Sequence, residues 1–185
     1  WKSHSLQKHL RDGWSIFHPE LGEYITPIPP QMREGADWYG GLFSAMRQNR
    51  YLIERNAERF VLTVEGDLVY RMDYAELIRY HRERGTVITA ACRGPDSGPK
   101  PAMAFDLAGE DRVRGLVSSE AVASGAGCAP MGVYLFNRDF LLDMLGSAEA
   151  VVTADQVPVA EAVANLAGSN EVSVYRFGGE RGRVS

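Results

Sequence analysis

The chain has 185 residues, of which 45% are hydrophobic and 24% charged, a balance typical of a globular protein with a sizeable core. Its formal net charge of −4 argues against a nucleic-acid-binding protein, which usually carries a basic stripe. No apolar run approaches the roughly 18 residues that suggest a membrane span. The two cysteines, Cys92 and Cys128, are too few for a disulfide scaffold, so we expect reduced, structural thiols in a cytoplasmic protein.

The first 40 residues are rich in proline and in aromatic residues. The prolines argue against a long helix there, although a short strand within residues 23–28 is compatible with the pattern. Apolar side chains then recur at helical spacing from Leu42 to Ile53. This spacing predicts one helix that ends near Asn56.

The following segments alternate between strand-like and helix-like patterns. Residues 60–64 form a short run of β-forming residues, which predicts a buried strand. Asp73 is placed to cap a helix over residues 74–84, and Gly85 is a natural C-terminal stop for it. A second strand is expected over residues 86–92.

The second half of the chain contains a hairpin pattern, because residues 102–106 and 112–117 flank a stretch rich in turn-forming residues. After it we expect a strand over residues 131–136, a helix capped by Asn137 and ending near Gly146, a helix over residues 157–166 and a last strand over residues 172–177.

This alternation of strands and helices predicts the fold class. It is typical of an α/β fold, here a three-layer sandwich with a mostly parallel mixed sheet. We place a single domain over residues 1–177 and a mobile tail over residues 178–185, which are rich in glycine and arginine.

The residues Val64, Glu65, Gly66 and Asp67 lie at the carboxyl end of the first predicted strand. In an open α/β sheet, ligands bind outside the carboxyl ends of the strands. Gly66 would let a ligand approach the backbone. Asp67 could hold Mg²⁺ against phosphate groups. A plain turn aspartate is the alternative interpretation of Asp67.

Several motifs resemble those of one known family. Residues 60–74 read FVLTVEGDLVYRMDY, and further motifs read PPQMR at 29–33, WY at 38–39 and MGVYLF at 131–136. In this order they resemble the ADP-glucose pyrophosphorylase (glucose-1-phosphate adenylyltransferase) family. That resemblance implies a Rossmann-like nucleotidyltransferase fold that joins ATP and glucose 1-phosphate into ADP-glucose and pyrophosphate, with Mg²⁺, in cytoplasmic glycogen or storage-polysaccharide synthesis.

The resemblance also implies roles for individual residues. Asp67 would be the catalytic, metal-binding carboxylate, and Asp155 lies roughly where the family has its second metal carboxylate. The nucleotide would be bound by Gln31, Tyr39, Gly41 and Gly66, and the sugar by Met131 and Gly132. The implied partners are the substrates and, in a homo- or hetero-oligomer, other family members, with no nucleic acid and no membrane.

The chain departs from the family pattern at several ligand positions. The family's glycine-rich phosphate loop and its β-helix domain are absent, so we expect a domain that is incomplete at its N-terminus and inactive as this chain alone. Leu42 replaces a nucleotide-contacting threonine, and Phe43 would add bulk beside the nucleotide. Residues 118–120 lack the lysine that binds the sugar phosphate, and Pro130 replaces a serine. These changes leave open a non-catalytic paralogue or regulatory subunit that pairs with an active member.

Overall fold

The computed structural model describes residues 4–14, 20, 25–28, 40–66, 68–94, 103–118, 127–168 and 171–178. The chain divides into two compact units, Trp1–Trp38 and Tyr39–Ser185. The first unit contains α1 (His4–Gly13), and residues 25–28 carry no strand, so that part of the expected early strand is not found. All other elements belong to the second unit, which is described by itself below.

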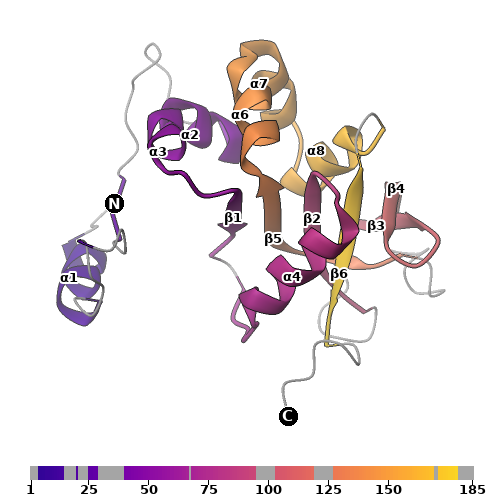
Figure 1. Cartoon of the computed structure of the whole chain (residues 1–185), viewed down its shortest axis with the longest axis horizontal. Coiled ribbons are helices and arrows are strands. Elements are labelled where there is room, and N and C mark those ends of the chain that lie inside the picture. Colours follow the sequence, from indigo (N-terminus) through magenta and orange to yellow (C-terminus); the bar gives the residue numbers. More distant parts are fainter. Residues whose placement is uncertain are drawn as a thin grey trace. The chain divides into compact units, whose positions relative to one another are not determined.

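The second unit is built on a six-stranded sheet with the order β1-β5-β2-β6-β4-β3 (Figure 1). Its strands are β1 (Phe60–Val64), β2 (Ile88–Arg93), β3 (Met103–Ala108), β4 (Arg112–Ser118), β5 (Ala129–Asn137) and β6 (Val172–Phe177). The predicted hairpin is confirmed as β3 and β4. These strands pair antiparallel, with Met103 opposite Ser118 at one end and Ala108 opposite Arg112 at the other.

The direction of β5 changes the character of the sheet. β5 lies between β1 and β2 and is antiparallel to both. β1 and β2 therefore run in the same direction without being neighbours, and only β2 and β6 form a parallel pair among the described strands. The α/β class and the mixed sheet are confirmed. The expectation of a mostly parallel sheet is wrong, because β5 lies between β1 and β2 and runs in the direction opposite to both.

Helices cover both faces of the sheet, which confirms the three-layer arrangement. α4 (Tyr74–Arg84) packs on one face. The other face is covered by α2 (Leu42–Gln48), α3 (Arg50–Arg55), α6 (Arg138–Gly146), α7 (Ala148–Asp155) and α8 (Val159–Leu166). β5 serves both layers, since Tyr134 and Phe136 face the larger group of helices while Val133 and Leu135 face α4. Each such buried side chain stabilises the fold by about 1.5–3 kcal/mol.

Local capping explains where α4 begins and ends. The Asp73 carboxylate accepts a hydrogen bond from the Ala75 backbone amide at 2.9 Å. At the other end, Gly85 has a φ of 66°, in the left-handed region that glycine adopts without strain. Both predicted limits of this helix are thus confirmed.

Three local predictions need correction. The helix expected from Leu42 is broken into α2 and α3 at Asn49, whose side-chain amide donates to the Ala45 carbonyl at 2.9 Å. The strand at residues 60–64 is not buried but lies at the edge of the described sheet, and Val64 is 47% exposed. α7 was not expected at all, and its cap is the Ser147 hydroxyl, which accepts from the Ala150 amide at 3.2 Å.

A buried polar network joins α4 to the sheet. His81 is 1% exposed; its Nδ1 lies 2.7 Å from the Thr89 hydroxyl and its Nε2 lies 3.0 Å from the Asn137 Oδ1. Because an amide oxygen only accepts, Nε2 carries the proton and Nδ1 accepts from Thr89. Ser173 extends the network to β6 through a 2.8 Å contact with Thr89. Asn137 precedes α6 but makes no side-chain cap, since its amide serves this network instead.

The length and the apolar character of the helices indicate whether any of them could span a membrane. Within the described ranges, no helix combines the length and the apolar character needed to cross a bilayer.

The buried histidine predicts a pH-dependent stability. Burial lowers the pKa of His81, so the folded state stays neutral where the unfolded chain, with a histidine pKa of about 6.5, already binds a proton. Stability should therefore fall as the pH drops below about 6.5, by at most about 1.4 kcal/mol per pH unit from this group. Thermal unfolding between pH 7.5 and 5 measures the slope. His81→Gln should flatten it, whereas His4→Gln, an exposed control, should leave it unchanged.

Candidate functional site

The candidate site lies at the edge of the sheet where β1 ends and β5 begins. Glu65 and Gly66 directly follow β1, and Met131 and Gly132 lie near the start of β5. The Glu65 backbone amide donates to the Gly132 carbonyl at 2.8 Å, so the two segments are in direct contact. The structure thus brings together Gly66 from the predicted nucleotide side with Met131 and Gly132 from the predicted sugar side.

Three of the predicted site residues, Gln31, Tyr39 and Asp67, lie outside the described residues. The catalytic role of Asp67 and the nucleotide contacts of Gln31 and Tyr39 stay predictions.

Gly66 is open on the side where a side chain would project. No described atom lies within 4 Å of the position that a Cβ would occupy there. A ligand could therefore reach the backbone at Gly66, as its residue type suggested.

A β-bulge shapes the sugar side of the site. β5 pairs with β2 as Val133 with Ala91, but the next pair is Pro130 with Cys92, so Met131 and Gly132 are extra residues on β5. Bulges are frequent beside active sites, where they re-aim side chains. Here the Met131 side chain is turned into the core and is 3% exposed, so any sugar contact by Met131 would come from its backbone.

Asp155 holds the start of α2. Its carboxylate accepts hydrogen bonds from the backbone amides of Phe43 at 3.0 Å and Ser44 at 2.6 Å. These amides point out of the first turn of α2, where negative charge is stabilising. Burial raises the pKa of the Asp155 carboxyl, and the two amide hydrogen bonds act in the opposite direction. Asp155, the last residue of α7, thus caps the N-terminus of α2 with its side chain.

This contact bears on the expected metal role of Asp155. Both of its oxygens already bind amides, so the carboxylate does not by itself fit a Mg²⁺ site. In the described part of the chain, no three acidic, histidine or cysteine side chains gather where they could hold a metal ion. Asp67 lies outside the described part of the chain, and the metal roles of both aspartates stay predictions.

Asp155 also explains the glycine at position 41. A Cβ on Gly41 would lie 2.6 Å from the Asp155 Oδ1, closer than packing allows. The φ of Gly41 is −173°, which any residue adopts, so the close approach and not the backbone angle requires glycine here. No local signal in the sequence could have shown this, because Asp155 and Phe43 are 112 residues apart.

Phe43 does not crowd the nucleotide region as expected. Its side chain is 0% exposed and packs edge-on against Phe136 of β5, with the ring centroids 6.4 Å apart. The bulk of Phe43 therefore belongs to the core.

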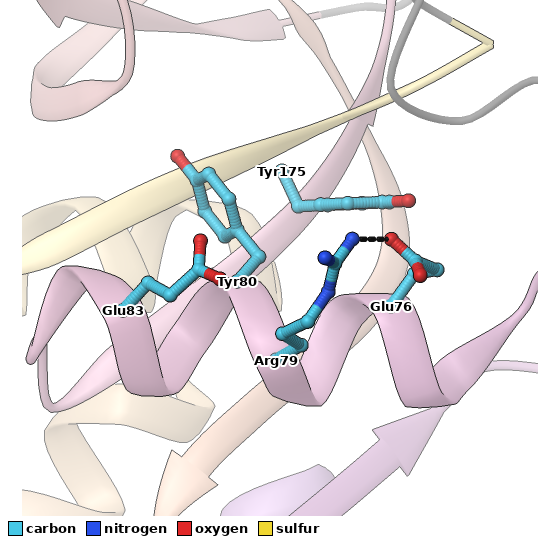
Figure 2. Close-up of a pocket in the computed structure, with 5 residues that line it drawn as sticks. All are labelled: Glu76, Arg79, Tyr80, Glu83 and Tyr175. Atoms are coloured by element: carbon cyan, nitrogen blue, oxygen red, sulfur yellow. Dashed lines mark hydrogen bonds and ion pairs between the residues drawn. The ribbon is translucent and has the colours of Figure 1, made fainter.

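A separate pocket of about 340 Å³ lies between α4 and β6 (Figure 2). Part of its lining is already engaged. The Arg79 guanidinium pairs with Glu76 beside the Tyr175 ring, and the Tyr80 hydroxyl lies 2.7 Å from an Asp111 carboxylate oxygen and 2.8 Å from the Val174 carbonyl oxygen. This pocket is best explained as a surface depression over polar side chains of α4 and β6.

Comparisons with known proteins relate the chain to one protein family. The family described as nucleotidyl transferase matches residues 2–175. The chain is 41% identical over its full length to glucose-1-phosphate adenylyltransferase 2 of Vibrio parahaemolyticus and 35% identical to that of Vibrio cholerae. It is 31% identical over 96% of its length to glucose-1-phosphate adenylyltransferase of Saccharophagus degradans. The chain spans about half of these relatives, 47%, 47% and 44% of their lengths.

The contact between Asp155 and Gly41 predicts an energetic coupling. Asp155→Ala should lower the free energy of unfolding by about 1–2 kcal/mol, as expected for loss of a helix cap. Gly41→Ala should also destabilise the protein, because its methyl group would meet the carboxylate. In the Asp155→Ala background the same methyl group should cost less, with a coupling of about 1 kcal/mol measured by denaturant unfolding.

Gly115→Ala provides the control for that cycle. It adds a methyl group in β4, where no described atom lies within 4 Å of it. Its effect should be the same with and without Asp155. Purely additive effects of Gly41→Ala and Asp155→Ala would contradict the direct contact.

Proposed function

The chain belongs to the nucleotidyl transferase family, and we propose that the complete protein is a glucose-1-phosphate adenylyltransferase. It would join ATP and glucose 1-phosphate into ADP-glucose and pyrophosphate for glycogen or storage-polysaccharide synthesis in the cytoplasm. The observation that carries the proposal is the contact between Glu65, which follows β1, and Gly132 in the bulge of β5, at the edge of the sheet where we propose that the two substrates meet. The similarity to enzymes of that name over the full chain supports it.

The reaction needs positioning more than a protein nucleophile. A phosphate oxygen of glucose 1-phosphate attacks the α-phosphorus of ATP, and the bond from that phosphorus to the bridging oxygen of pyrophosphate breaks. Mg²⁺ bound at Asp67 would supply the neutralisation of phosphate charge. The remaining tasks fall to the chain itself: Gly66 leaves the backbone open to a ligand, and Asp155 holds the segment of Gly41 that would line the nucleotide.

The alternative is a non-catalytic paralogue that keeps the fold and pairs with an active family member. One of its arguments is weakened, because Phe43 is packed in the core and does not fill the nucleotide region. The substitutions at Leu42, at residues 118–120 and at Pro130 remain its support. Homo- and hetero-oligomers are both compatible with either function.

Pyrophosphate release by the complete gene product, with ATP, glucose 1-phosphate and Mg²⁺, tests the proposal. Asp67→Asn should lower kcat by about 100-fold or more, since it removes charge from the place where the metal is proposed to bind. Asp73→Asn is the matched control, because asparagine caps a helix as well as aspartate does, and it should keep activity within about threefold.

An inactive wild-type protein that also binds no product would contradict the proposed enzyme activity. If it releases no pyrophosphate and shows no heat of binding with millimolar ADP-glucose, the adenylyltransferase proposal fails. Co-elution with an active relative, together with a change in the kinetics of that relative, would then support the regulatory alternative.

A further inference from the structure

The side chain of Glu65 lies across Gly132. A Cβ on Gly132 would be 2.7 Å from the Glu65 Oε2, 2.8 Å from its Cβ and 2.9 Å from its Cδ. The whole Glu65 side chain, and not only its flexible end, therefore occupies the space beside the Gly132 Cα. Glycine is required at position 132 for this reason as well as for its φ of 66°.

The backbone of Glu65 joins the same residue. Its amide donates to the Gly132 carbonyl at 2.8 Å, just beyond the last ladder pair of β1 with β5, Val64 with Val133. Because the bulge removes Met131 and Gly132 from the pairing with β2, this hydrogen bond gives the bulge a partner on the β1 side. One residue thus holds the bulge through both its backbone and its side chain.

The charge of Glu65 is also directed toward β5. Burial raises the pKa of Tyr134, and the nearby Glu65 carboxylate raises it further. Tyr134 lies two positions after Gly132 and is 1% exposed. Glu65 itself is half-buried, so its carboxylate rests against the start of β5 although it follows a strand at the sheet edge.

β1 needs such an attachment. It has five residues, and β5 is its one neighbour among the described strands. The end of a short edge strand tends to fray, because few hydrogen bonds hold it. Here that end leads directly into Gly66 and Asp67, whose placement against the phosphates would decide the rate.

From this geometry we infer that Glu65 is a positioning residue, which clamps the catalytic segment after β1 to the Met131–Gly132 bulge on the sugar side. The inference rests on the proposed function for its kinetic consequence, whereas the clamp itself stands on the contacts above. Glu65 acts through Gly132 and Gly66 and does not need to touch a substrate. In the sequence, Glu65 shows only as part of the turn before Asp67.

The test compares Glu65→Ala with Glu65→Gln in the complete gene product. Glutamine keeps the shape of the side chain and should hold kcat/KM for glucose 1-phosphate within about threefold of the wild type. Alanine removes the part of the side chain beyond Cβ, and with it the side-chain half of the clamp. It should lower kcat/KM by about 10- to 100-fold, because small misplacements near the reacting atoms have effects of this size. Equal losses in both variants would show that the charge, and not the clamp, matters, and would overturn the inference.

Hydrogen–deuterium exchange provides a readout that does not depend on catalysis. In Glu65→Ala, amides of residues 64–66 and of residues 131–133 should exchange faster together, while α4 and the β3–β4 hairpin keep their wild-type protection. If the wild type proves inactive, the proposed function fails but this experiment still tests the clamp. Unchanged exchange in both segments would overturn the clamp even in an active enzyme.

A pair of glycine variants covers the case in which Glu65→Ala does not fold. Gly132→Ala and Gly109→Ala introduce the same methyl group at similar positive φ angles, 66° and 71°, but only position 132 has Glu65 beside it. Gly132→Ala should accelerate exchange at residues 64–66 and lower kcat/KM, and Gly109→Ala in the hairpin turn should do neither. Identical behaviour of the two variants would contradict the inference.

Discussion

The architecture of the second unit depends on the insertion of β5 between β1 and β2. This nine-residue strand is hydrogen-bonded on both sides and buried on both faces. Its alternating side chains supply the core under α4 and the core under the larger group of helices. β1 has no other neighbour among the described strands, so the register of β5 also determines where the segment containing Gly66 leaves the sheet.

The same strand places the candidate site. Its bulge at Met131 and Gly132 lies opposite the end of β1, which brings two motifs from separate parts of the chain into contact. Active sites at the edges of α/β sheets are commonly assembled in this way, from loops that follow different strands. The bulge also turns one of the motif residues, Met131, into the core, so that part of a family motif serves packing.

Among the described residues, two contacts pair a carboxylate with a glycine that could not be replaced without a collision. Asp155 covers Gly41 and caps α2, and Glu65 covers Gly132 and holds the bulge. In each case the acidic residue belongs to one element and stabilises the backbone of another. Both glycines lie in motifs that the family resemblance assigned to substrate binding, and the contacts give them a structural reason as well.

The sequence by itself determined the features that depend on neighbouring residues. Asp73 and Gly85 predicted both ends of α4, the turn residues after Ala108 predicted the hairpin, and the motif at residues 60–74 indicated the family. Only the tertiary structure decided the direction of β5, the burial of Met131 and Phe43, and the partner of Asp155. The physical reason is the range of the interactions. Caps and turns form within a few residues, whereas strand order, core contacts and the cap on α2 join residues that only the complete fold brings together.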